Sequence, residues 1–279
     1  MTDTSLDELN GKLVIGIDLG TTKSGVAVYS EQERRPVMLR DANGDDTIPS
    51  IVAWDRDTDA WLVGKPAKAV LELRPWDVAY SVKRFIGRSF SDRAVAAGRG
   101  SVTYDMAGAG VGSDLTRNVL VRLGQEGGVR HTLDIPTISS MVLLHLRQTA
   151  ATALGLSLDE VTYAVVTVPA YFDTLQRKAT QAACEAAGLK ARILHEPIAA
   201  ALAHGDELLA AKERTILVYD LGGGTFDISL LDVSRDARGY QFFTRLIDGH
   251  TQLGGDDIDA AISSMLEREI ERSTGEVVR

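Results

Sequence analysis

Residues 216–231, ILVYDLGGGTFDISLL, contain the pattern on which the interpretation of the whole chain depends. Their apolar run, rich in branched residues, predicts a buried strand ending at Asp220, and a second strand is expected from about Phe226. The glycines at 222–224 permit a tight turn whose backbone N–H groups can approach an oxyanion without a Cβ in the way. Asp220 and Asp227 place carboxylates beside that turn. The unit therefore suits a metal-bound phosphate chain, although an ordinary glycine-rich hairpin has the same pattern.

A second copy of this pattern favours the phosphate-binding interpretation. Residues 13–29, LVIGIDLGTTKSGVAVY, begin with an apolar strand that ends in the triplet Asp-Leu-Gly at 18–20. A turn of small residues follows, and then another apolar strand over residues 25–29. The same triplet stands at 220–222, so the sequence contains a duplicated supersecondary unit. Two such hairpins that face each other across a cleft can hold one nucleoside triphosphate from both sides.

Composition and charge narrow the class of protein. A chain of 279 residues that is 44% hydrophobic can bury a large core, and we expect more than one lobe. The net charge of −9 argues against a nucleic-acid partner, which would require a basic surface. The polar first ten residues and the lack of a long apolar run predict no signal peptide and no membrane span, hence a cytoplasmic protein. The single cysteine, Cys184, rules out an internal disulfide and is expected to be a buried helix residue.

Three helices are expected between the two glycine turns, and each closes at a glycine: residues 136–155, 173–188 and 197–205. Thr137 is the expected N-cap of the first helix. Asp173 and Gln176 have the spacing of a capping box at the start of the second. Buried strands are predicted over residues 161–168 and near Ile193. These signals indicate an α/β fold in which strands and helices alternate.

The region between about residues 51 and 136 has weaker periodicity, and we interpret it as an inserted subdomain. Short strands at 51–54 and 61–63 and a helix at 67–73 are predicted within it. The glycines from 108 to 112 resemble part of a dinucleotide-binding fingerprint, but no apolar strand leads into them. We therefore expect a flexible loop there.

Several charged side chains have either a functional or an ordinary structural interpretation. Lys83 and Arg84 form an adjacent pair of cations that would be either site residues or a solvated helix end. Glu196 stands where a strand meets a helix and would either stabilise the helix N-terminus or project into the cleft. His195 and His204 lack acidic or cysteine partners at ligand spacing, so structural or surface roles are expected.

A third glycine turn lies near the end of the chain. Gly254 and Gly255 precede a helix expected over residues 257–271, after a strand at 242–248. Glycines before a helix N-terminus give an anion-binding geometry. The alternative is a plain helix start capped by Asp256.

Together these stretches resemble the nucleotide-binding domain of the Hsp70 chaperone family, within the actin/hexokinase-like ATPase superfamily. The similar segments occur in the family's order and are IGIDLGTT (15–22), VKRFIGR (82–88), VTVPAYFD (166–173), EPIAAALA (196–203), VYDLGGGTFDIS (218–229) and LGGDDID (253–259). Actins and sugar kinases share only the looser hairpin pattern.

The resemblance implies an actin-like ATPase fold of the ribonuclease H-like type, with two lobes around a nucleotide cleft. The division expected is a tail at 1–12, a first-lobe core at 13–50 and 136–205, an insertion at 51–135, a partial second-lobe core at 206–250, and the start of an outer subdomain at 251–279. Because the family domain continues beyond the position of Arg279, we expect a truncated second lobe and weak adenosine affinity.

The resemblance also implies residue roles. Asp18 and Asp220 would orient a hydrated magnesium ion. Lys83 would reach the γ-phosphate, and Glu196 would place the attacking water, with Asp220 and Thr225 close by. The implied nucleotide-binding residues are Gly20, Thr21, Thr22, Lys23, Gly222, Gly223, Gly224, Thr225, Gly254 and Gly255. Pro169 and Arg177 match positions that relay the nucleotide state to a peptide-binding domain.

The function implied is an ATPase module of a chaperone, using ATP/ADP, Mg²⁺ and, as a candidate, K⁺. The implied partners are a J-domain co-chaperone, a nucleotide exchange factor and unfolded peptide clients, with a monomeric state. The alternatives are a nucleotide-binding or structural module with little turnover, and a small-molecule kinase of the same superfamily. Two departures from the family pattern are Lys23 and His195, which stand where Asn is usual and affect turnover or nucleotide preference rather than removing a catalytic group.

Overall fold

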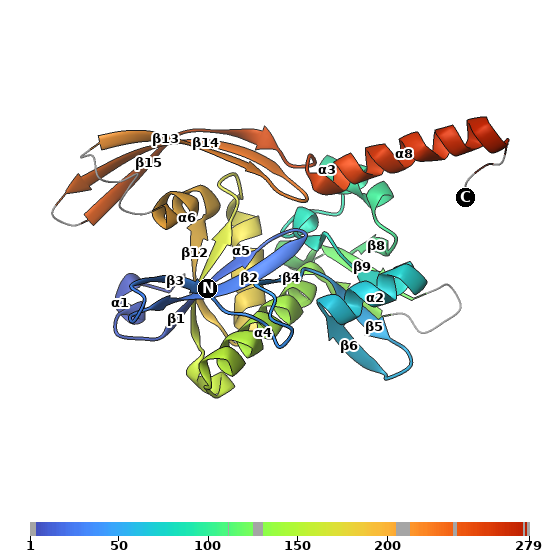
Figure 1. Ribbon diagram of the computed structural model, residues 1–279. Helices are drawn as coiled ribbons and strands as arrows, with labels where there is room; N and C mark the ends of the chain where they lie inside the picture. The colour runs from blue at the N-terminus through green and yellow to red at the C-terminus, as the bar shows by residue number, and fades with distance from the viewer. Residues whose placement is uncertain are drawn as a thin grey trace.

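The computed structural model describes residues 4–110, 112–124, 131–204, 213–236, 239–275 and 277. These residues form a mixed α/β structure in which the strands belong to four sheets (Figure 1). Within the described ranges, no helix combines the length and the apolar character needed to cross a bilayer.

The largest sheet carries the first glycine turn. Its strands lie in the order β12-β11-β1-β2-β3, with β4 paired to β2. The strands are β1 (Val14–Leu19), β2 (Lys23–Ser30), β3 (Arg35–Met38), β4 (Thr47–Pro49), β11 (Tyr163–Val168) and β12 (Lys190–His195). β12, β11 and β1 are parallel, whereas β2 runs antiparallel to β1. Because the carboxyl ends of β1 and β12 lie at the same edge, the turn after β1 and the residues that follow β12 are brought together.

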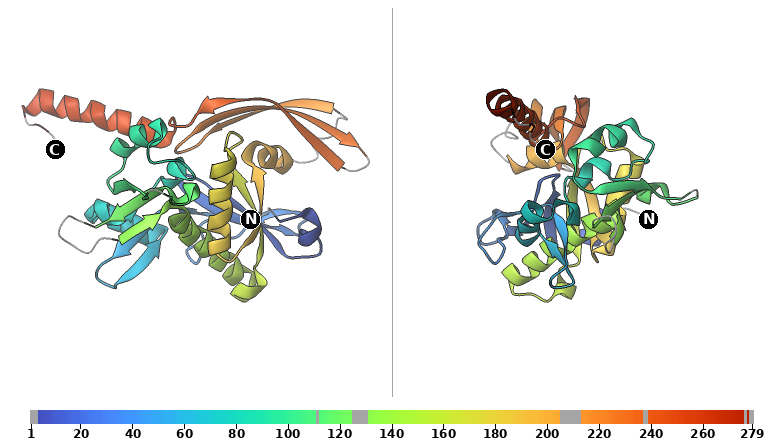
Figure 2. Two further views of the ribbon diagram at one scale, coloured as in Figure 1. Left: turned by 180° about the vertical axis from the view of Figure 1, so that it is seen from behind. Right: turned by 90° about the vertical axis from the view of Figure 1, so that its right-hand side faces the viewer.

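Helices α4 (Ile135–Leu154) and α5 (Thr174–Ala186) pack on this sheet, and α5 crosses the face that is seen from behind in Figure 2. Leu143 and Leu146 of α4 are fully buried in the same cluster as Ile15 and Ile17 of β1. Cys184 is buried on α5, as expected. Helix α6 (Glu196–Ala203) leaves the end of β12. The short elements are α1 (Leu6–Leu9) and η5 (Leu158–Glu160), and Leu158 of η5 packs against this core.

The segment between β4 and α4 forms two small sheets, ordered β6-β5-β7 and β10-β9-β8. Its elements are β5 (Val52–Asp55), β6 (Ala60–Val63), α2 (Lys65–Leu73), η1 (Pro75–Asp77), β7 (Val78–Ala79), η2 (Val82–Phe85), α3 (Arg93–Gly98), η3 (Arg99–Ser101), β8 (Asp105–Gly108), η4 (Leu115–Arg117), β9 (Val119–Leu123) and β10 (His131–Asp134). Gly108, expected in a loop, instead ends β8 and pairs with Val119 of β9. The strand forms because it pairs with β9, and a glycine pattern within residues 108–112 carries no signal for that pairing.

The second glycine turn belongs to an antiparallel sheet of β13 (Glu213–Leu221), β14 (Phe226–Asp236) and β15 (Gly239–His250). Ala201 of α6 packs with Leu231 and Val233 on one face of this sheet. The other face exposes large apolar side chains, among them Leu217 and Phe243. Helix α8 (Gly255–Thr274) follows and extends away from the end of the sheet (Figure 1).

Two helix starts differ from the sequence-based expectation. Asp134, not Thr137, caps α4, because its Oδ1 accepts the backbone N–H of Thr137 at 2.7 Å. At α8 the N-cap is Gly254, whose N–H donates to the Asp257 carboxylate at 2.9 Å, so Asp256 is not the cap. The capping box of Asp173 and Gln176 is confirmed. Gly205, the expected end of α6, lies outside the described residues.

The corrected cap of α4 predicts a difference between two substitutions. Asp134→Ala should lower the free energy of unfolding by about 1 kcal/mol or more, because it removes the cap and the ion pair with Arg117. Thr137→Ala should cost only about 0.5 kcal/mol or less, since Thr137 does not cap the helix. Urea titrations of both variants measure these values. Equal losses, or a larger loss for Thr137→Ala, would show that Asp134 is not the functional cap.

Candidate functional site

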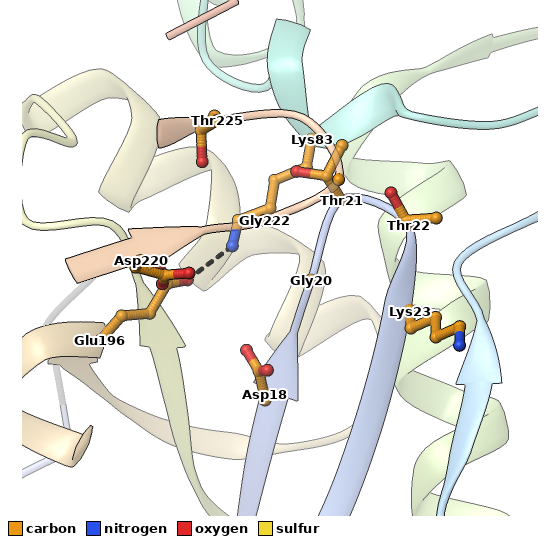
Figure 3. Close-up of a pocket in the computed structure, with 11 residues that line it drawn as sticks. Asp18, Gly20, Thr21, Thr22, Lys23, Lys83, Glu196, Asp220, Gly222 and Thr225 are labelled. Carbon is orange, nitrogen blue, oxygen red and sulfur yellow. Dashed lines mark hydrogen bonds and ion pairs between the residues drawn. The ribbon is translucent and has the colours of Figure 1, made fainter. Parts of the chain in front are cut away.

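The two glycine turns meet at one cavity of about 340 Å³ (Figure 3). One wall comes from the end of β1 and the turn that follows it, and the opposite wall comes from the end of β13 and its turn. The lining residues are Asp18, Gly20, Thr21, Thr22, Lys23, Lys83, Glu196, Asp220, Gly222, Gly223 and Thr225. The structure thus brings together residues from four distant segments of the chain.

Glycine is required within the first turn, between the two turns, and where residue 254 packs on the second turn. A Cβ added at Gly223 would lie 1.6 Å from Thr22 Oγ1 of the opposite turn. A Cβ at Gly20 would lie 2.1 Å from the carbonyl oxygen of Lys23. At Gly254 an added Cβ would lie 2.5 Å from the backbone of Gly223. These approaches leave backbone and hydroxyl groups, rather than bulky side chains, at the walls where an oxyanion would bind.

The acidic end of the cavity is formed by Asp18 and Asp220, which both line it. Thr167 Oγ1 donates to Asp18 Oδ1 at 3.0 Å, which fixes the carboxylate of Asp18. Burial raises the pKa of Asp220, and the nearby charge of Asp18 acts in the same direction. Because both carboxylates would be more stable beside a cation, this end of the cavity suits a positive ion.

Lys83 is not a solvated helix end. Its Nζ lies 2.7 Å from Glu196 Oε1, and both side chains are largely buried (Figure 3). Glu196 is also the first residue of α6, where a carboxylate stabilises the helix N-terminus. Burial raises the pKa of Glu196, while the ammonium group of Lys83 opposes that rise. The pair therefore places one cation and one carboxylate at the wall between the two turns.

The donor set fits a hydrated divalent ion rather than a directly ligated one. Among the residues that the structure describes, no group of three or more His, Cys, Asp or Glu side chains is arranged to hold a metal. Magnesium commonly keeps several waters and uses one or two carboxylates together with substrate phosphates. Asp18 and Asp220 match that requirement. They line the same cavity as the glycine turns, where an added Cβ atom would clash.

Two residues of the site had been given no role from the sequence. Asp227 is buried, and its Oδ2 accepts the hydroxyl of Thr225 at 3.0 Å. Burial raises the pKa of Asp227 to about 6. Burial also raises the pKa of Tyr171, and the side chain of Thr225 opposes that rise. The sequence signal for Asp227 was its place beside the second glycine turn, and Tyr171 follows Pro169 and Ala170 in the loop after β11.

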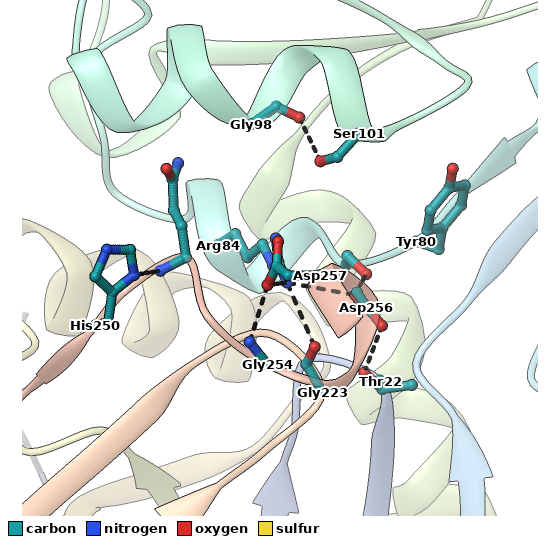
Figure 4. A network of polar contacts seen from close by, with 12 residues as sticks. Thr22, Tyr80, Arg84, Gly98, Ser101, Gly223, His250, Gly254, Asp256 and Asp257 are labelled. Carbon is teal, nitrogen blue, oxygen red and sulfur yellow. Dashed lines mark hydrogen bonds and ion pairs between the residues drawn. The ribbon is translucent and has the colours of Figure 1, made fainter. Parts of the chain in front are cut away.

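The first turn of α8 packs against the second glycine turn (Figure 4). Asp256 N–H donates to the carbonyl of Gly223 at 2.8 Å, and Ser81 Oγ donates to Asp256 Oδ2 at 2.6 Å. Arg84 reaches Asp257 with both of its terminal nitrogens, at 3.1 and 2.7 Å. Gly254 and Gly255 therefore support the second turn from behind instead of lining the cavity themselves.

The remaining predicted residues lie at or beyond the rim. Lys23 lines the cavity, but its side chain points away from Asp18 and Asp220 in Figure 3. Pro169 lines a small adjoining cavity. Arg177 is on α5, where it donates to the carbonyl of Phe172 at 2.5 Å, outside the cavity lining. His195 is the last residue of β12, and burial lowers its pKa.

Comparison with known protein families gives a match over most of the chain. The model of the family described as "Hsp70 protein" matches residues 14–278 of this chain. The matched range contains both glycine turns and the lining of the cavity between them.

The raised pKa of Asp227 predicts a pH-dependent stability. Because the folded chain binds this proton more tightly than the unfolded chain, its contribution to stability is present below about pH 4 and is lost as pH rises to about 6. Asp227→Asn removes that loss, so it should stabilise the protein by about 1–2 kcal/mol more at pH 8 than at pH 4. Urea titrations at both pH values test this.

Asp92→Asn is the matched control. The N–H of Ala94 lowers the pKa of Asp92, so the control should be relatively less stable at the higher pH. A pH-independent difference between Asp227→Asn and the parent would contradict the assignment.

Proposed function

Because this chain belongs to the Hsp70 family of ATP-binding chaperones, we propose that the cavity between its glycine turns binds ATP and hydrolyses the γ-phosphate. The observation that carries the proposal is the convergence of Asp18, Asp220, Lys83 and Glu196 on one cavity walled by two glycine turns. Backbone amides at such turns and a lysine are the groups that bind polyphosphates in proteins. No comparable feature in the described cavity points to a second, acceptor substrate, as a small-molecule kinase would need.

The reaction proposed is the transfer of the terminal phosphoryl group to water. The bond between the phosphorus and the attacking water oxygen forms, and the bond to the oxygen bridging the β- and γ-phosphates breaks. In such a reaction, positioning and charge stabilisation supply most of the rate enhancement. The turns at 20–22 and 222–225 would hold the phosphates, and Lys83 would stabilise negative charge on the γ-phosphate oxygens.

The carboxylates of the site would orient the attacking water and accept its proton. Glu196 already accepts a hydrogen bond from Lys83 and faces the same cavity. Asp227, with its pKa of about 6, accepts from Thr225, whose hydroxyl lines the cavity. A group with a pKa near neutrality is suited to take up a proton at physiological pH. We therefore assign water placement to Glu196 and proton uptake to Asp227 through Thr225.

Asp18 and Asp220 are the residues that would hold a hydrated magnesium ion. When bound, that ion would neutralise phosphate charge and orient the substrate. K⁺ is a further candidate ion for the same acidic region.

We extend the proposal to the organisation of the family. The division is a first-lobe core at 13–50 and 136–205, an insertion at 51–135, a second-lobe core at 206–250 and an outer subdomain from 251. Pro169 and Arg177 would couple the nucleotide state to peptide binding. J-domain co-chaperones, nucleotide exchange factors and unfolded peptides are the partner classes proposed, for a monomeric cytoplasmic protein. Lys23 and His195 would adjust nucleotide preference and turnover.

Removing the Lys83 cation should reduce hydrolysis. Single-turnover assays with radiolabelled ATP should show a rate for Lys83→Ala about 10²–10³-fold below that of the parent, because a preorganised charge is lost. Lys178→Ala, which removes an exposed lysine on α5, is the control and should keep the parent rate. Equal and negligible phosphate release by parent and Lys83→Ala would instead favour a binding module without turnover.

Metal dependence tests the acidic end of the cavity. Calorimetric titration should show that EDTA weakens ATP binding to the parent, and that Asp18→Asn and Asp220→Asn reduce the benefit of added magnesium. We expect each variant to lose about 10-fold or more in affinity for ATP with magnesium, equivalent to about 1.4 kcal/mol. A parent affinity that does not respond to magnesium, or a variant whose response to magnesium equals that of the parent, would contradict the assignment of these two carboxylates.

A further inference from the structure

Arg84 is the side chain that joins the helical turn η2 to the start of α8 (Figure 4). Its Nη1 and Nη2 atoms lie 3.1 and 2.7 Å from the two carboxylate oxygens of Asp257. Nη2 also donates to the carbonyl of Gly223 at 3.4 Å. One guanidinium group therefore contacts both α8 and the second glycine turn.

Arg84 and Lys83 reach opposite partners because they are consecutive in a 3₁₀-helix. Side chains that follow each other in such a helix point about 120° apart. Lys83 extends to Glu196 on the wall formed by α6, whereas Arg84 extends to Asp257 on α8. The four residues of η2 thus connect a proposed catalytic lysine with the element that supports the second turn.

The second turn cannot move independently of α8. Gly255 N–H donates to the carbonyl of Gly222 at 3.0 Å, and Asp256 N–H donates to that of Gly223 at 2.8 Å. Gly254 is packed directly on Gly223. A shift of α8 relative to η2 would therefore carry the second turn away from the first.

The burial and geometry of the Arg84–Asp257 ion pair suit it to fixing the distance between η2 and α8. The Arg84 side chain is only 4% exposed, and that of Asp257 is 30% exposed. A bidentate arginine–carboxylate pair specifies orientation as well as separation, which a lysine cannot do equally well. Water screens such a pair less than it screens an exposed one.

We propose that Arg84 is a positioning residue that sets the separation of the two glycine turns through Asp257 and the Gly223 carbonyl. It does not line the main cavity and is not itself a group that would touch the phosphates. The inference rests on the proposed function, since correct separation of the turns matters for catalysis if both turns hold one polyphosphate.

The first experiment measures hydrolysis by Arg84→Met, Asp257→Asn and the double variant. A misplacement of about 1 Å can cost roughly 10²-fold in rate, so each single variant should lose about 10–100-fold in kcat. KM should change less than kcat, and the double variant should be no slower than Arg84→Met, because both substitutions break the same contact. Arg84→Lys should recover part of the rate.

Arg117→Met is the control, because it breaks another arginine–aspartate pair, with Asp134, away from the cavity. It should keep the parent kcat. A kcat for Arg84→Met within about threefold of the parent, or a loss matched by Arg117→Met, would overturn the proposal; additive losses would do the same.

The second experiment does not depend on hydrolysis. Spin labels attached at Glu72→Cys on α2 and Ser263→Cys on α8 report the separation of these helices by pulsed dipolar spectroscopy. The positions are exposed, whereas the native Cys184 is buried. Arg84→Met and Asp257→Asn should each shift or broaden the distance distribution, and Arg117→Met should not.

The two experiments separate the two proposals. An unchanged distance distribution in both Arg84→Met and Asp257→Asn would overturn the positioning role whatever the rates are. A changed distribution combined with no phosphate release from the parent would refute the ATPase proposal while supporting the role of Arg84 in spacing the turns.

Discussion

The close contact between the two glycine turns is the constraint on which the site depends. Thr22 of the first turn occupies the space that a Cβ of Gly223 would need, so the turns can meet only without side chains at that point. The contact joins the largest sheet to the β13–β15 sheet and leaves the cavity between them. Every other group of the site is arranged around it, with carboxylates at the strand ends and basic residues on η2.

The lining of the cavity contains more carboxylates than cations. This excess of negative charge fits an anionic phosphate chain only when a metal cation is bound with it. Asp18, Asp220 and Glu196 line the cavity, and Lys83 is the cation paired among them. The pKa values of Asp220 and Glu196 are raised mainly by burial, which means that the ionised carboxylates are held at a cost. Perturbed groups that converge in one cavity are a general sign of a functional site. A bound metal ion would offset that cost, because it would lie beside these carboxylates.

The sequence predicted which segments and side chains form the site. It did not predict the contacts that hold these side chains in place. The repeated Asp-Leu-Gly triplet predicted both hairpins, because strand and turn signals act over a few residues. The partner of Arg84 could not be predicted, since Asp257 lies 173 residues away and only the folded chain brings them together. The cap of α4 was missed because Asp134 also ends β10, so its side chain belongs to both a strand end and a helix start. Asp227 was noticed as an acid, but its raised pKa follows from burial, which no local pattern reveals.

Helix α8 is held near the cavity by its first turn and otherwise projects outward (Figure 1). Its 20 residues span about 30 Å, whereas one helical turn spans about 5.4 Å. A tilt that displaces the first turn by about 0.5 Å would thus swing the distal end by about 3 Å, by simple proportion of those lengths. The helix therefore enlarges small displacements: a movement of the glycine turns that is hard to detect at the turns themselves becomes measurable at the distal end of α8.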